Sequence, residues 1–125
     1  MDRHTQSRLQ RERVIWLVTA SKEGRPQAVP VWFLWDGRSF LVYAQDGAKV
    51  THIRSNPYVE LHLNSDEAGD DLVRASGRAS MTNAIKLTDP YVRKYRRDIT
   101  DLDMTPASFV RTYHNAIRIR EVKFH

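Results

Sequence analysis

The first half of the chain contains three short apolar runs separated by only a few turn residues, and this spacing limits the possible fold more than any other feature. The runs are rich in Val, Ile, Trp and Phe and cover residues 14–20, 27–35 and 39–44. Residues 21–26 (SKEGRP) have turn chemistry, and Asp36-Gly37 is a strong hairpin signal. The pattern therefore predicts three antiparallel strands in meander order.

The rest of the chain adds further strands and several helices. Strand patterns occupy residues 58–63, 72–81 and 116–124, and helical patterns occupy residues 1–12, 46–57, 82–98 (with a break at Asp89-Pro90) and 105–114. Because strands and helices do not alternate, a doubly wound fold is not supported. The sequence predicts one mainly β domain over residues 1–125: a six-stranded antiparallel β-barrel with attached helices, with a sandwich as the alternative.

Two strand positions break local rules. Pro30 lies inside the second run, where it cannot donate to a ladder, so it belongs at an edge, a bulge or a place where the sheet opens. Glu121 falls on the apolar register of the last strand, and a β-bulge near it would restore the alternation. We regard Pro30 as a pointer to function, because such violations gather at functional sites.

Composition excludes several classes of protein. The chain has no Cys, so it has no disulfide, thiolate metal site or cysteine nucleophile, and its five His are too scattered to predict a metal site. It lacks a run of about 18 apolar residues and an apolar N-terminal signal core, so we expect no membrane partner and a cytoplasmic location. The net charge of +5 favours an anionic ligand.

Residues at the start of the second helical segment are the first candidates for binding such a ligand. Lys49 follows Gly47 where backbone N–H groups are free, and a lysine there can neutralise a phosphate. His52 lies three residues on and can converge with Lys49 on one anion, while Arg54 lies further round the helix. The alternative is an ordinary solvated helix face, and spacing alone favours it.

Two other segments carry candidate chemistry. Gln27, ahead of Pro30, has donor and acceptor groups that could read the edge of a heterocycle. The basic segment Arg93-Lys94-x-Arg96-Arg97, with Tyr91 and Tyr95, could bind single-stranded nucleic acid, but nearby aspartates argue against a nucleic-acid partner. No hydrolase elbow, P-loop or dinucleotide fingerprint occurs.

Taken together, two spaced motifs resemble a known family. The first is Gly24-x-Pro26-Gln27-x-Val29-Pro30-Val31-Trp32-Phe33, and the second is Lys49-x-x-x-Ile53-Arg54-x-Asn56-Pro57. The chain resembles the pyridoxamine 5′-phosphate oxidase-like, FMN-binding split-barrel superfamily from about residue 13 to residue 124. Within it, the sequence is most similar to the small deazaflavin (coenzyme F420)-dependent branch of actinobacteria.

The resemblance implies a six-stranded split β-barrel, a homodimer and a cofactor in the groove between subunits. It implies that Lys49 contacts the cofactor phosphate, that Gln27 and the backbone of Val29, Pro30 and Val31 lie beside the ring or ribityl chain, and that Tyr43 and Ala44 form the floor. His52 and Arg54 complete the candidate cofactor-binding set. Gly47 stands where several relatives carry a basic residue, and Arg54, Arg74 or Arg78 could supply the second phosphate contact in its place.

Three hypotheses about function remain open from the sequence. The first is an oxidoreductase that transfers a hydride between reduced F420 and a small conjugated organic substrate, with His52 or Tyr43 as a candidate proton donor. The second keeps the fold and uses FMN. The third is a non-catalytic protein that binds a cofactor, haem or nucleic acid. The first explains why no conventional catalytic constellation is found, since the cofactor carries the chemistry.

Overall fold

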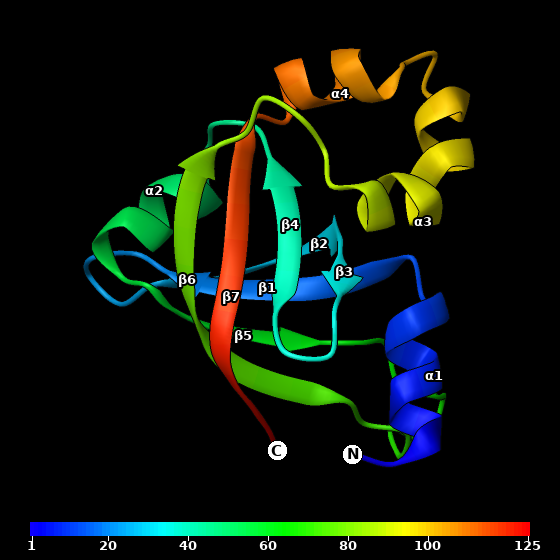
Figure 1. Cartoon of the computed structure of the whole chain (residues 1–125). Helices are drawn as coiled ribbons and strands as arrows, with labels where there is room; N and C mark the ends of the chain where they lie inside the picture. The colour runs from blue at the N-terminus through cyan, green and yellow to red at the C-terminus, as the bar shows by residue number, and fades with distance from the viewer.

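A single antiparallel sheet curls around the core of the protein (Figure 1), and the computed structural model describes all residues from 1 to 125. Its strands are β1 (Val14–Ala20), β2 (Pro26–Trp32), β3 (Leu34–Trp35), β4 (Phe40–Ala44), β5 (Tyr58–His62), β6 (Arg74–Asn83) and β7 (Asn115–Phe124). The spatial order is β2-β1-β5-β6-β7-β4-β3. The mainly β fold class with attached helices is confirmed, with seven strands in place of the predicted six.

The extra strand arises because the predicted strand 27–35 is interrupted at Phe33. The Phe33 N–H donates to the Tyr95 hydroxyl at 2.8 Å, and the Phe33 carbonyl accepts from Lys94 Nζ at 2.8 Å. These side-chain bonds replace ladder bonds, so the strand ends at Trp32 and resumes as β3. A local sequence pattern cannot reveal this break, because both partners come from a helix about 60 residues later.

The interruption also explains why the barrel is split. The two edge strands of the sheet, β2 and β3, are consecutive in the chain and joined only by Phe33. β3 pairs with β4 only at Leu34–Leu41 and Trp35–Phe40. The rest of β4 has β7 on one side and no strand on the other. An opening therefore remains between β2 and the end of β4.

Four helices surround this sheet: α1 (Arg3–Arg11), α2 (Ala48–Ser55), α3 (Asp89–Asp101) and α4 (Pro106–Thr112). The predicted helix over 82–98 is wrong in its first part, because β6 continues to Asn83 by pairing with Asn115 of β7. The helix begins instead at Asp89-Pro90, where Pro occupies the first turn. No helix has the length and apolar character needed to cross a membrane.

The bulge expected near Glu121 is confirmed. Ser76 pairs with Lys123 and Arg78 pairs with Arg120, so Gly77 alone faces Glu121 and Val122. Glu121 has a φ of 53°, the left-handed conformation found at the first residue of a G1-type bulge. The bulge keeps the apolar side of β7 directed inward on both sides of the irregularity.

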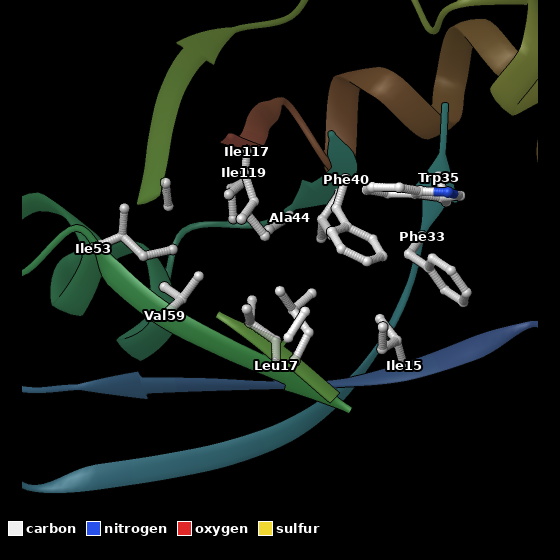
Figure 2. Packing of buried hydrophobic residues seen from close by; sticks show 14 of the residues in the cluster. Ile15, Leu17, Phe33, Trp35, Phe40, Ala44, Ile53, Val59, Ile117 and Ile119 are labelled. Atoms are coloured by element: carbon white, nitrogen blue, oxygen red, sulfur yellow. The ribbon is translucent and has the colours of Figure 1, made fainter. Parts of the chain in front are cut away.

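Two apolar clusters lie on the two faces of β4. Inside the curl, β1, β4, β5 and β7 contribute residues such as Leu17, Phe40, Val59 and Ile119 (Figure 2). Outside it, α3 and α4 pack on β4, as Figure 1 also shows. All five residues of β4 are therefore buried, and its end meets both the opening and the helix pair.

Candidate functional site

A pocket of about 320 Å³ lies at the opening between β2 and β4. We call it the β2–β4 pocket. Its wall combines one segment from β2, one from the end of β4, the start of α2 and the α3–α4 pair. The lining residues are Pro30, Val31, Trp32, Tyr43, Ala44, Gln45, Lys49, Tyr91, Leu102, Phe109 and Tyr113. The site thus occupies the place where the sheet fails to close.

Stacked aromatic rings form one wall of this pocket. The Trp32 ring lies 4.8 Å from Tyr95 and 5.5 Å from Phe109, and it is nearly parallel to both. Phe109 stacks in turn on Tyr113 at 4.4 Å. Offset parallel rings at these separations attract one another. The stack fixes flat surfaces beside the pocket, and such surfaces suit a planar heterocycle.

Three tyrosines meet where α3 packs on β4, and their hydroxyls differ. The Tyr43 hydroxyl accepts a hydrogen bond from the Thr88 N–H at 3.0 Å. The Tyr95 hydroxyl is bonded to Phe33 and to the Arg13 carbonyl. The Tyr91 hydroxyl is buried and has no hydrogen-bond partner. Burial, and then the neighbouring Tyr95, raises the pKa of Tyr91 far above its usual value.

Lys49 supplies the only cationic side chain of the pocket. It lies in the first turn of α2, after Gly47, which makes no side-chain cap. The Asn115 amide donates to the Ala44 carbonyl at 3.1 Å and to Asp46 Oδ1 at 2.9 Å, and these bonds hold the connection from β4 to α2. Lys49 takes part in none of the seven ion pairs of the chain. Its ammonium is therefore available to an anion.

The structure brings five of the predicted site residues together in the pocket: Lys49, Pro30, Val31, Tyr43 and Ala44. They come from β2, β4 and α2, which the opening in the sheet places around one space. Val29 belongs to the same strand and pairs with Leu17, but it does not line the pocket.

Three predicted residues lie elsewhere. Gln27 and His52 border a separate depression beside the β1–β2 turn. The His52 Nδ1 atom lies 2.9 Å from the Thr19 hydroxyl, which ties α2 to β1. Arg54 borders a third depression with Asp46 and residues of β6. The structure thus does not gather these residues around Lys49 within one chain.

The α3–α4 wall was not predicted. The sequence alone links Tyr91 and Tyr95 only to a basic and aromatic nucleic-acid segment, yet both are fully buried and cannot stack on bases. Their spacing of four residues, repeated by Phe109 and Tyr113, indicates one aromatic face on each helix. This aromatic spacing is visible in the sequence, but it does not indicate which part of the sheet the two helices pack against.

Solved structures share this architecture at low identity. An F420 reductase is 20% identical, with a TM-score of 0.72, and the match covers 100% of this chain and 98% of that chain. The heme storage protein HutZ from Vibrio cholerae is 13% identical (TM-score 0.64; 98% and 91% covered). General Stress Protein 26 from Bacillus anthracis is 18% identical (TM-score 0.66; 97% and 94% covered).

These likenesses establish the fold, and the family follows from the sequence itself. No curated protein matches the chain. Residues 1–124, however, match the family described as pyridoxamine 5′-phosphate oxidase, and this range includes every element that surrounds the β2–β4 pocket. The chain therefore belongs to the pyridoxamine 5′-phosphate oxidase family.

Proposed function

We propose that the β2–β4 pocket holds the ring system of a planar, anionic redox cofactor and that the protein is an oxidoreductase. The cofactor we favour is coenzyme F420, with FMN as the alternative, and the substrate is a small conjugated organic molecule. The observation that carries this proposal is the combination of stacked aromatic rings and one unpaired lysine in the opening of the sheet.

The residues of the pocket suit such a cofactor. Eight of its eleven lining residues are hydrophobic, which favours a flat ring over a polar substrate. Lys49 matches a phosphate or phosphodiester, and the net charge of +5 attracts an acidic tail. The F420 reductase among the structural neighbours supports the deazaflavin choice. No histidine lines the pocket, so its lining offers haem no imidazole ligand.

In this mechanism the protein binds the cofactor and shields it from water. The cofactor, when bound, supplies the hydride chemistry. Lys49 neutralises the anionic group and fixes that end of the molecule. Trp32 and the rings stacked with it orient the plane, while α3 and α4 restrict the access of water. The Tyr43 hydroxyl accepts from the Thr88 N–H, which leaves its own O–H free to donate, so Tyr43 is the candidate proton donor for the reaction.

The first test is a fluorescence or absorbance titration of the purified protein with F420 and with FMN. We expect binding to at least one, and binding to neither would overturn the proposal. Lys49→Ala should weaken binding by about 1.5–3 kcal/mol, roughly ten- to a hundredfold. Lys86→Ala is the matched control, because Lys86 is exposed and lies outside the pocket. Equal weakening by both variants would indicate a general charge effect.

A further inference from the structure

The buried tyrosines beside the pocket provide an internal comparison. Tyr43, Tyr91 and Tyr95 share one apolar cluster, with Tyr91 between the other two: its ring centroid lies 4.7 Å from that of Tyr43 and 4.8 Å from that of Tyr95. The Tyr43 and Tyr95 hydroxyls have protein partners, whereas the Tyr91 hydroxyl has none. A buried hydroxyl without a partner costs free energy, so folding alone does not explain its presence.

Tyr91 also differs in position. It lines the β2–β4 pocket, with its side chain fully buried at 0% exposure. Its ring is packed against Tyr43, Tyr95 and Phe109, which leaves it little freedom to turn toward another protein group. The hydroxyl is therefore left without a protein partner, and an acceptor on a ligand in the pocket would reach it only if neighbouring side chains moved.

We propose that Tyr91 is a ligand-recognition residue whose hydroxyl donates a hydrogen bond to a neutral acceptor, a carbonyl oxygen or an unprotonated ring nitrogen, on the planar ligand of the β2–β4 pocket. This inference rests on the proposed function and deepens it. It makes Tyr91 a residue that selects rings carrying such an acceptor over rings of the same shape that lack one.

The chemistry of the surroundings supports a neutral donor and a neutral acceptor. Burial, and then Tyr95 and Tyr43, raises the pKa of Tyr91, so its phenol keeps its proton under ordinary conditions. The rings of Tyr43 and Phe109 beside it offer no counter-charge for an anion. The anionic part of the ligand belongs with Lys49, the only cation of the pocket.

A second buried hydroxyl without a partner supplies the matched control. Thr88 Oγ1 lies three residues before Tyr91, where α3 begins, and it makes no side-chain cap. It does not line the pocket. If any unpaired hydroxyl near α3 influenced binding through the fold, Thr88→Val would act like Tyr91→Phe. Direct recognition requires that only the Tyr91 variant respond.

The test compares wild type, Tyr91→Phe, Thr88→Val and Tyr95→Phe by thermal unfolding without ligand and by titration with F420 and FMN. Without ligand, Tyr91→Phe should leave the midpoint temperature unchanged or raise it, while Tyr95→Phe should lower it by removing bonds to Phe33 and Arg13. For the cofactor that wild type binds, Tyr91→Phe should weaken affinity about fivefold to tenfold. Thr88→Val should leave affinity unchanged.

The outcomes separate this inference from the proposed function. If wild type binds a cofactor and Tyr91→Phe binds it equally well, the recognition role of Tyr91 is wrong and the proposed function stands. A loss of ligand-free stability in Tyr91→Phe as large as in Tyr95→Phe would reveal a protein partner and also overturn the role. If wild type binds neither F420 nor FMN, both the proposed function and this inference fail.

Discussion

At the scale of single residues, Lys94 shows how a charged side chain is used to end a strand. Its Nζ donates to the Phe33 carbonyl and lies 3.8 Å from the centre of the Phe33 ring. Burial, and then the nearby charge of Arg13, lowers the pKa of Lys94 to about 8. Glu12 acts in the opposite direction, and its effect is smaller. The interaction that interrupts the sheet is therefore sensitive to pH.

The expected consequence is a pH-dependent contribution of Lys94 to stability. In the unfolded chain a lysine titrates near pH 10.4. Between about pH 8 and 10.4 the unfolded state thus binds more protons than the folded state, so the stability contribution rises with pH across this window. Below it both states are protonated, and the cost of burying the charge is constant.

Urea unfolding of wild type and Lys94→Met at pH 7.5, 8.5 and 9.5 measures this contribution. The unfolding free energy of wild type minus that of the variant should increase with pH, because other titrating groups cancel in the difference. Lys86→Met, at an exposed position, controls for the loss of a lysine. A difference that stays flat or falls would contradict the assignment.

At the scale of elements, the β6–β7 bulge depends on the absence of a side chain at Gly77. A Cβ built there would lie 2.6 Å from Ile119 Cγ2 and 2.9 Å from the Arg120 carbonyl oxygen. Ile119 is fully buried and the second contact is backbone, so neither neighbour can move freely. The glycine is therefore required by close approach of β7.

Gly77→Ala should lower the unfolding free energy by about 1–3 kcal/mol, the usual cost of overpacking. A glycine inside a strand is otherwise unfavourable, so without the contact alanine would be neutral or stabilising. Chemical denaturation gives the value. Ser80→Ala, exposed on the same strand, should change it by no more than about 0.5 kcal/mol. A gain in stability for Gly77→Ala would contradict the close packing of the bulge.

Element by element, local patterns predict much of this fold and only part of the pocket. Alternation and turn chemistry located the strands, and the misplaced Glu121 located the bulge. The division of β2 from β3 escaped prediction because Tyr95 and Lys94 bond to Phe33 across the molecule. The wall made by α3 and α4 could not be predicted for a similar reason, because an aromatic face on a helix does not indicate which strand it packs against.

At the scale of the whole molecule, the outer face of the sheet supports the proposal of a homodimer. In β1, Ile15 and Leu17 point into the core. The alternating residues Val14, Trp16 and Val18 lie on the opposite face and are only partly buried. A strand with apolar residues on both faces is typical of one that is covered on both sides. A second copy of the chain would cover this face.

Sedimentation velocity tests the association. We expect a species of twice the 14.6 kDa chain mass at micromolar concentration. Val18→Lys, which places a charge on the outer face of β1, should shift the protein toward monomer, whereas Ala107→Lys, at an exposed position of α4, should not. A monomeric wild type would contradict the dimer and leave the fold unchanged.

The prolines of β2 affect the tendency of the protein to aggregate at high concentration. β2 is an edge strand of seven residues that contains Pro26 and Pro30. The other edge strand, β3, has only two residues. A strand from another molecule could not pair fully with β2, because its prolines lack N–H donors. It could pair with β3 over only two residues. Pro30, which lines the β2–β4 pocket, thus also protects this edge of the sheet against the strand addition that leads to fibrils.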